Sequence, residues 1–185
     1  MSEARVDRLQ QGLAHILGSP RDRGTLEMVV RRPAEDEREV VNEARIEPGR
    51  GVVGDSWGSR GVPSLEAEVT VMNARCIALL AGEVDRWPLA GDQLYVDMDL
   101  SEANLPPGTR LTIGSAVLEV SAKPHRGCSK FSARFGPEAL TLVNSEDGRA
   151  ARLRGLNTSV VTGGTVRVGD AVTKSSGGAG ATAGG

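Results

Sequence analysis

The chain has 185 residues, of which 39% are hydrophobic and 25% charged, and this suits one packed domain better than two. A net charge of −2 argues against nonspecific nucleic-acid binding as its main task, although a local basic pocket for a small anion is compatible with it. The charged N-terminus resembles no signal peptide, and no stretch reaches the roughly 18 apolar residues of a membrane helix. With two cysteines and no zinc-type spacing, we expect a cytoplasmic protein with reduced thiols.

The first part of the chain is predicted to form a helix, three strands and a long loop. Apolar residues at helical spacing predict a helix over 4–17. The β-rich stretch 25–33 predicts a strand that stops at a proline. The pattern of 37–47 is ambiguous, and the turn after it favours a strand. The glycine-rich stretch 49–64 indicates a loop of the kind that often carries function, and 66–73 alternates like a strand.

The second part is predicted to form further strands with short helices between them. The expected elements are a short helix over 74–82 capped by Asn73, a strand within 85–100, a hairpin of 110–113 with 116–122, a helix near 137–144, and a second hairpin over 156–172 that turns at Gly163–Gly164.

Strands therefore outnumber helices, without the regular strand–helix alternation of a doubly wound sheet. The predicted fold is mostly β: an antiparallel β-barrel with a few short helices and α+β elements at the periphery. We expect a helix and lead-in over 1–24, the barrel domain over 25–174, and a disordered tail rich in glycine, alanine and serine over 175–185.

Cys128 is the most informative residue of the chain. It lies in PHRGCSKFSARFG (124–136), surrounded in sequence by His125, Arg126, Lys130 and Arg134. Nearby cations favour the thiolate, which is the form that attacks electrophiles and ligates soft metals. Pro124 and Gly127 place the cysteine on a bend. Cys76, within the apolar run CIALLA, is expected to be buried instead.

Several segments in a fixed order resemble one family. They are GVVGDSW (51–57), MNARCIALLAG (72–82), the stretch from LAGDQLYVDMDL to IGSAVLEV (89–120), PHRGCSKF (124–131) and GTVRVGD (164–170). Together they resemble the MOSC domain, named for the C-terminal domain of molybdenum cofactor sulfurases, over roughly residues 25–172. Many members have proline directly before the cysteine, where this chain has Gly127.

The resemblance implies a β-barrel with one reactive cysteine that faces a cleft and is associated with the molybdenum cofactor. In the family this cysteine is proposed either to carry sulfur as a persulfide or to ligate molybdenum, as in the amidoxime-reducing relatives. Cys128 occupies that position here. We find no PLP-dependent desulfurase domain in the sequence, so sulfur would have to come from a partner such as a cysteine desulfurase.

The resemblance also suggests roles for further residues around the cofactor, which is molybdopterin with its phosphate and oxo-metal. We expect Cys128 to supply the thiolate and metal ligand and His125 to shuttle a proton, with Arg75, Lys130 and Arg134 as anion partners, Asn73 and Asp92 at the pterin edge, and Asp55 and Arg60 closing the pocket. The alternatives are ordinary ones: a helix cap for Asn73, turn formation for the aspartates, and a solvated basic face for Lys130 and Arg134.

Four functions are compatible with this sequence. The first is a stand-alone MOSC protein that binds the molybdenum cofactor or carries sulfur for it. The second is a molybdenum-dependent reductase of N-hydroxylated compounds, which would need an electron-donating reductase because the chain has no flavin or iron–sulfur motif. The third is a binding module for the cofactor or another anion, without turnover. The fourth is a thiol-based detoxification enzyme without metal. Whether the chain is an enzyme therefore stays open at this stage.

Overall fold

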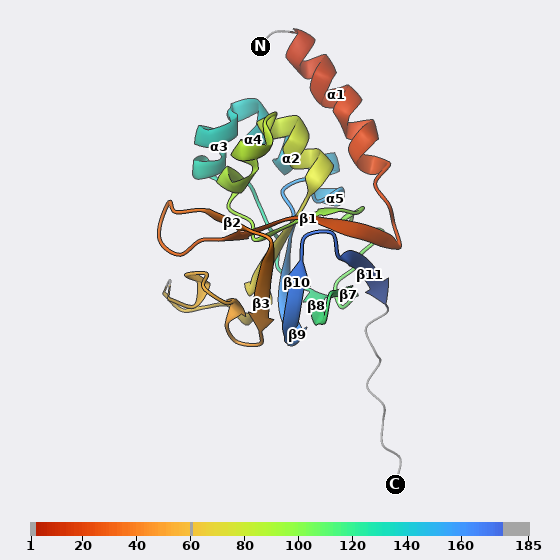
Figure 1. Ribbon diagram of the computed structural model, residues 1–185. Coiled ribbons are helices and arrows are strands. Elements are labelled where there is room, and N and C mark those ends of the chain that lie inside the picture. Colours follow the sequence, from red (N-terminus) through yellow and green to blue (C-terminus); the bar gives the residue numbers. More distant parts are fainter. Residues whose placement is uncertain (1–2, 60, 176–185) are drawn as a thin grey trace.

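A closed β-barrel forms the centre of the structure. The computed structural model describes residues 3–59 and 61–175 (Figure 1). Seven strands of this described part close the barrel, in the order β1 (Arg23–Arg31), β6 (Leu94–Asp97), β5 (Val69–Asn73), β9 (Leu156–Thr162), β8 (Ala116–Val120), β7 (Arg110–Ile113) and β11 (Ala171–Ser175). β11 then pairs with the start of β1, which closes the sheet on itself. The predicted β-barrel is confirmed.

Neighbouring barrel strands run antiparallel, with the exception of β5 and β6, whose pairing is parallel. A parallel pair needs a crossover connection. Here the crossover consists of helix α2 (Ala74–Ala81) and the 3-10 helix η3 (Val84–Ala90). This strand–helix–strand unit is the α+β element that the sequence predicted at the periphery.

A smaller sheet lies beside the barrel. It contains β10 (Gly164–Arg167), β3 (Glu43–Glu47) and β4 (Gly51–Val52). β2 (Glu39–Val41) does not belong to it and pairs with the C-terminal part of β1. The predicted hairpin over 156–172 is therefore wrong in its pairing, since β10 leaves β9 and pairs with β3. At Gly164 a Cβ would collide with the backbone of Ser115, so the chain passes between the two sheets at a point where only glycine fits.

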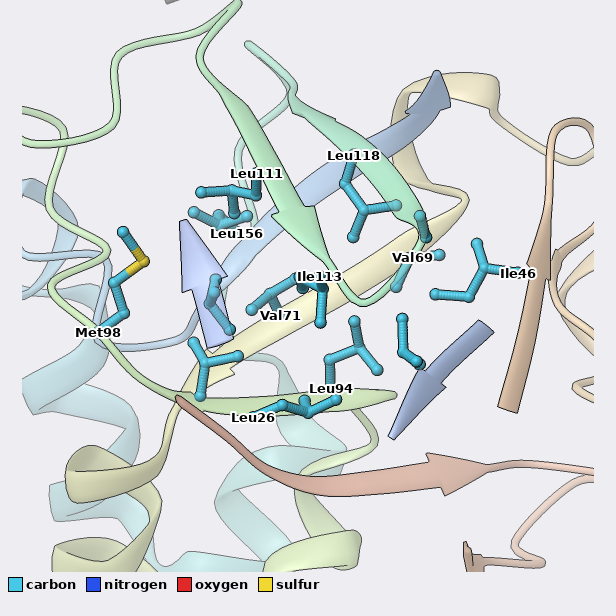
Figure 2. Packing of buried hydrophobic residues seen from close by; sticks show 14 of the residues in the cluster. Leu26, Ile46, Val69, Val71, Leu94, Met98, Leu111, Ile113, Leu118 and Leu156 are labelled. Atoms are coloured by element: carbon cyan, nitrogen blue, oxygen red, sulfur yellow. The ribbon is translucent and has the colours of Figure 1, made fainter. Parts of the chain in front are cut away.

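The barrel interior is filled by aliphatic side chains that alternate along the strands. Figure 2 shows Leu26, Val71, Leu94, Leu111 and Leu118 lying close together inside the barrel, and each is fully buried. In a strand, successive side chains point to opposite faces, so an apolar residue at every second position fills one interior. Burying one such side chain contributes about 1.5–3 kcal/mol, which explains how a chain with 3% aromatic residues can build this core.

The helices gather at one end of the barrel (Figure 1). α2, α3 (Ser129–Phe135) and α4 (Pro137–Asn144) contribute to a second apolar cluster that includes Ile77, Phe131 and Phe135, and α5 (Glu146–Ala150) follows α4. α1 (Glu3–Leu17) reaches this layer through Gly12, which lies so close to Leu79 of α2 that a side chain at position 12 would collide with it. The short 3-10 turns η1 (Trp57–Ser59) and η2 (Leu65–Ala67) lie in the loop before β5.

The predicted helices over 4–17, 74–82 and 137–144 are confirmed, as is the hairpin that turns between Ile113 and Ala116. α3 and α5 were not predicted. The proposed tail over 175–185 lies outside the described residues apart from Ser175, and the domain boundaries stay a prediction. No helix in the described ranges is long and apolar enough to cross a membrane.

Candidate functional site

Cys128 opens into a small pocket with a strongly cationic lining. The pocket has a volume of about 160 Å³. Its charged lining consists of Arg32, Arg38, Lys130, Arg134 and Arg154, together with the carboxylates of Glu35 and Asp36. These side chains come from the segment between β1 and β2, from α3, and from the turn before β9. The fold thus brings cations that are far apart in the sequence together around one thiol.

The surroundings of Cys128 favour its thiolate. The side chain is exposed, and the residue stands directly before α3. The backbone N–H of Phe131 has the largest effect and lowers the pKa of the thiol. Burial opposes it, but the Lys130 N–H and the positive charges of Arg154 and Arg134 lower the pKa as well, so the net shift is downward. Cys128 is the N-cap residue of α3, but its side chain makes no capping hydrogen bond, so these N–H groups act on the sulfur through their dipoles. Cys128 is therefore an exposed thiol whose surroundings favour the thiolate form.

Cys76 behaves in the opposite way. It is fully buried in α2 and its thiol donates to the carbonyl of Leu153 at 3.1 Å. Burial raises the pKa of Cys76 to about 12. The predicted contrast between a packed cysteine and a reactive one is in agreement with these surroundings.

Gly127 holds Cys128 in place through Asn144 of α4. The Asn144 side chain accepts from the Gly127 N–H at 3.0 Å and donates to the Gly127 carbonyl at 3.1 Å. A Cβ at position 127 would lie 2.7 Å from Leu140 and 2.9 Å from Val143. Glycine therefore stands before the cysteine because the backbone approaches α4 closely and because its N–H is hydrogen-bonded, which proline could not provide.

We expect Asn144→Ala to destabilise the protein by about 1–3 kcal/mol, because it leaves two partly buried backbone groups of Gly127 unpaired. Urea unfolding of the variant measures this loss. Thr141→Ala is the matched control on the same helix, since its hydroxyl bonds only an exposed carbonyl. Equal stabilities of the two variants would contradict the anchoring role of Asn144.

Arg154 and Asp92 form a buried ion pair beneath the pocket. Arg154 Nη1 donates to Asp92 Oδ2 at 2.6 Å, and Nη2 donates to the Ala90 carbonyl at 2.9 Å. The guanidinium also lies 5.0 Å from the centre of the Phe131 ring. Asp92 was expected at a pterin edge. Instead it is absent from the pocket lining and holds Arg154 there, so its role is one of positioning.

His125 lies beside this pair and is neutral at physiological pH. Its Nδ1 is 3.5 Å from Asp92 Oδ1, a separation at which no hydrogen bond closes. Burial, and then the charge of Arg154, lower the pKa of His125 to about 4, and the attraction of Asp92 opposes this only in part. The expectation of a proton shuttle with a pKa near neutrality is therefore corrected: the imidazole is not charged in the range where such a shuttle works.

Three nitrogen and oxygen atoms of this cluster lack partners. Arg154 Nε, Asp92 Oδ1 and His125 Nδ1 are buried without a hydrogen bond to any described residue. Unpaired buried polar atoms are uncommon in proteins and often mark a place where a water or ligand binds. The cluster thus combines a fixed charge pair with spare hydrogen-bonding capacity next to the Cys128 pocket.

Asp55 contributes to the pocket through Arg32. Arg32 Nε and Nη2 donate to the two carboxylate oxygens at 2.8 Å each, and Nη1 donates to the Gly91 carbonyl at 2.8 Å. Burial by itself would raise the pKa of Asp55, but the hydrogen bonds and charge of Arg32 outweigh it and hold that pKa below its usual value. Asp55 does not line the pocket itself, although it fixes a cation that does.

The segment 33–38 is tied to α3 by two exposed ion pairs. Lys130 Nζ lies 3.1 Å from Glu35, and Arg134 Nη2 lies 3.1 Å from Asp36. Arg134 also donates to the Leu89 carbonyl at 2.9 Å. Lys130 and Arg134 line the pocket, but each pairs with an acidic side chain of this segment. Exposed pairs of this kind contribute about 0–1 kcal/mol, so they separate easily.

Two further predicted site residues, Asn73 and Arg75, do not line the pocket. Asn73 caps α2 by accepting from the Cys76 N–H, and its amide nitrogen donates to Ser19 and to the Met98 carbonyl, so this buried side chain is used fully by the fold. Arg75 pairs with Asp97 at 2.7 Å and donates to the His15 carbonyl. Both expectations are corrected by these contacts. Arg60 lies outside the described residues.

The sequence predicted no role for Arg32, Arg38, Arg154 and Asn144. The run RRPAEDER (31–38) carries an available signal, because it concentrates charge around a proline between two strands. Arg154 and Asn144 have no comparable signal, since their roles depend on contacts with residues far away in the chain.

Fold and pocket together define a closed β-barrel protein that presents one exposed cysteine among arginines. The sequence model of the MOSC domain matches residues 82–173. The chain belongs to the MOSC domain family. No curated protein gives a significant match to its sequence.

Solved structures support the fold. The chain resembles YiiM from Escherichia coli with a TM-score of 0.56 and 19% identity, over 82% of this chain and 70% of that one. It also resembles the YuaD protein from Bacillus subtilis, with a TM-score of 0.55 and 16% identity, over 82% and 95% of the two chains. A structure described as a hypothetical protein gives a TM-score of 0.60 and 19% identity, over 82% and 67%. At these identities the likeness concerns the fold.

Proposed function

We propose that this MOSC protein binds the molybdenum cofactor in the Cys128 pocket, with Cys128 either ligating molybdenum or carrying sulfur as a persulfide. The observation that carries the proposal is an exposed thiol of lowered pKa in a pocket whose lining includes five cationic side chains. A thiolate suits a soft metal or a sulfane sulfur, and guanidinium groups suit phosphate and oxo groups.

The donor set fits this cofactor. Among the described residues there is no group of three His, Cys, Asp or Glu side chains that could hold a metal ion. A protein site for bare metal is thus not supported, whereas a cofactor that brings its own dithiolene needs only one protein thiolate. When bound, the cofactor supplies a redox-active metal centre. Arg32, Arg38, Lys130, Arg134 and Arg154 would hold its anionic groups, and Cys128 would face its metal.

The pocket has to widen for the whole cofactor. Its volume of about 160 Å³ is smaller than the roughly 300–1,000 Å³ of typical cofactor sites. The segment 33–38 borders the pocket, and its ion pairs to Lys130 and Arg134 are exposed and weak. Its movement away from α3 would enlarge the pocket and release both cations for the ligand.

Metal and pterin analysis tests the proposal. The protein is purified from a host that makes the cofactor, beside Cys128→Ser and the control Cys76→Ala. We expect wild type and Cys76→Ala to retain molybdenum and pterin. The molybdenum content of Cys128→Ser should be lower than that of wild type by about tenfold or more, because a hydroxyl is a poor ligand for a soft metal. Absence of both components from wild type, or equal content in Cys128→Ser, would remove the basis of the proposal.

Two further readouts separate the roles of Cys128. A mass increase of one sulfur atom on Cys128 after incubation with a cysteine desulfurase would support sulfur carrying. Turnover of a hydroxylated amine in the presence of an added reductase would support the partner-dependent reductase, with Cys128 as the metal ligand. Cofactor retention without either result would support the binding module.

A further inference from the structure

A second cavity, larger than the Cys128 pocket, lies along the segment that leads to Cys128. Its volume is about 310 Å³. The segment 121–126 forms one side, and α4, α5 and the turn before β9 contribute the others. Arg154 lines both cavities, while Cys128 lines only the smaller one. The two spaces are therefore neighbours with separate linings.

The lining of this cavity carries an excess of positive charge, although the whole chain has a negative net charge. Lys123, Arg126, Arg149, Arg152 and Arg154 contribute positive charge, and Glu102 is the single acidic residue of the lining. The whole chain carries a net charge of −2. An accumulation of this kind raises the local concentration of small anions.

Two of these arginines have spare hydrogen-bonding capacity. Within the described part of the chain, the side chains of Arg126 and Arg149 make no hydrogen bond and no ion pair. Arg152 lies deeper and donates to the carbonyls of Leu105 at 2.6 Å and Leu100 at 3.3 Å. Its guanidinium is thereby fixed, and the charge of Glu102 in the same lining acts on it without a direct ion pair. Fixed and free cations together form a lining that an oxyanion can complete.

The bottom of the cavity adds buried polar atoms. His125 lines it, with an unpartnered Nδ1, and Arg154 lines it, with an unpartnered Nε and a side chain that is 9% exposed. Pro107, Val143 and Leu156 form an apolar wall. A ligand that suits this mixture has charged oxygens at one side and a small apolar body at the other.

We propose that this cavity binds a small organic molecule carrying two or more negative charges on oxygen, as in a phosphate ester or a polycarboxylate. The site is distinct from the Cys128 pocket and does not depend on binding of the molybdenum cofactor. Because Arg154 lines both spaces, an occupant here contacts the residue that also supplies charge near Cys128.

Calorimetric titration of the purified full chain with pyrophosphate and, separately, with citrate tests the site at constant ionic strength. The cavity variant is Arg126→Gln with Arg149→Gln. The control variant, Arg45→Gln with Arg167→Gln, removes the same charge from exposed positions on the smaller sheet. We expect saturable binding of at least one probe to wild type, weakened about tenfold or more in the cavity variant and less than about twofold in the control. The preferred probe identifies phosphate or carboxylate as the ligand class.

A third variant keeps this test separate from the one above. Lys130→Gln with Arg134→Gln changes only the Cys128 pocket. Binding that survives in this variant and in Cys128→Ser supports the second site even if the protein never holds molybdenum. The proposal is overturned by lack of saturable binding of both probes, by equal weakening in the cavity and control variants, or by binding lost only in the Lys130 and Arg134 variant.

Discussion

Arg154→Met is expected to reduce the free energy of unfolding by roughly 3–5 kcal/mol, the usual cost of removing one partner from a buried ion pair. The Asp92 side chain has no exposure and Arg154 is its one ion-pair partner within 3 Å among the described residues. Without the guanidinium, the carboxylate stays buried and uncompensated. The variant also loses the hydrogen bond to the Ala90 carbonyl and the contact with Phe131.

Chemical denaturation of wild type and variant measures this effect. Arg110→Met provides the control, because its pair with Glu119 is about one-third exposed on both sides and should contribute less than about 1 kcal/mol. The double variant Arg154→Met with Asp92→Asn should regain part of the loss, since it removes the stranded charge. A cost below about 1 kcal/mol for Arg154→Met would show that the pair does not hold this end of the barrel together.

Acidification is expected to destabilise the protein by roughly 3 kcal/mol through His125 alone. In the folded state the pKa of His125 is lowered to about 4, whereas in the unfolded chain it is about 6.5. Below pH 6.5 the unfolded chain therefore binds a proton that the folded protein does not bind, and this binding stabilises the unfolded state relative to the folded one. Stability is unaffected by this group above pH 6.5 and falls as the pH is lowered from 6.5 to 4.

His125→Gln isolates this contribution, because its side chain does not titrate. The free energy of unfolding of wild type, minus that of the variant, should fall by roughly 3 kcal/mol between pH 7 and pH 4. Asp55 also favours stability at higher pH, since its pKa is lowered in the folded state, but its effect begins lower, below about pH 4, and is common to both proteins. Parallel stability curves over that range would contradict the burial of a neutral His125.

The barrel could be predicted from the sequence because its determinants are local. Alternating apolar residues in strands such as 110–113 and 116–120, and the turn between them, need no distant information. The pairing of β10 with β3 could not be foreseen in the same way. Gly163–Gly164 is typical of a hairpin turn. The pairing of β10 with β3 depends instead on contacts with distant residues, namely the close approach of Gly164 to Ser115 and the free edge that β3 offers.

The candidate site divides along the same line. Cys128, Lys130 and Arg134 are neighbours in the sequence, so a charged surrounding for the thiol could be predicted from that segment alone. Arg32 follows β1 and Arg154 lies in the turn before β9, so only the folded barrel brings them to the pocket. Asn73 and Arg75 illustrate the reverse case: their types suit a ligand site, but the nearest partners, at Cys76, Ser19 and Asp97, use them for the fold.

The thiol pKa of Cys128 tests most directly the claim that the fold activates this cysteine. The rate of alkylation by iodoacetamide is measured against pH for wild type and Cys128→Ser. We expect one reactive thiol with a midpoint below the usual value of about 8.5, lost entirely in the variant, because the pKa of Cys76 is raised to about 12. A midpoint at or above about 8.5, or reaction that persists in Cys128→Ser, would contradict it.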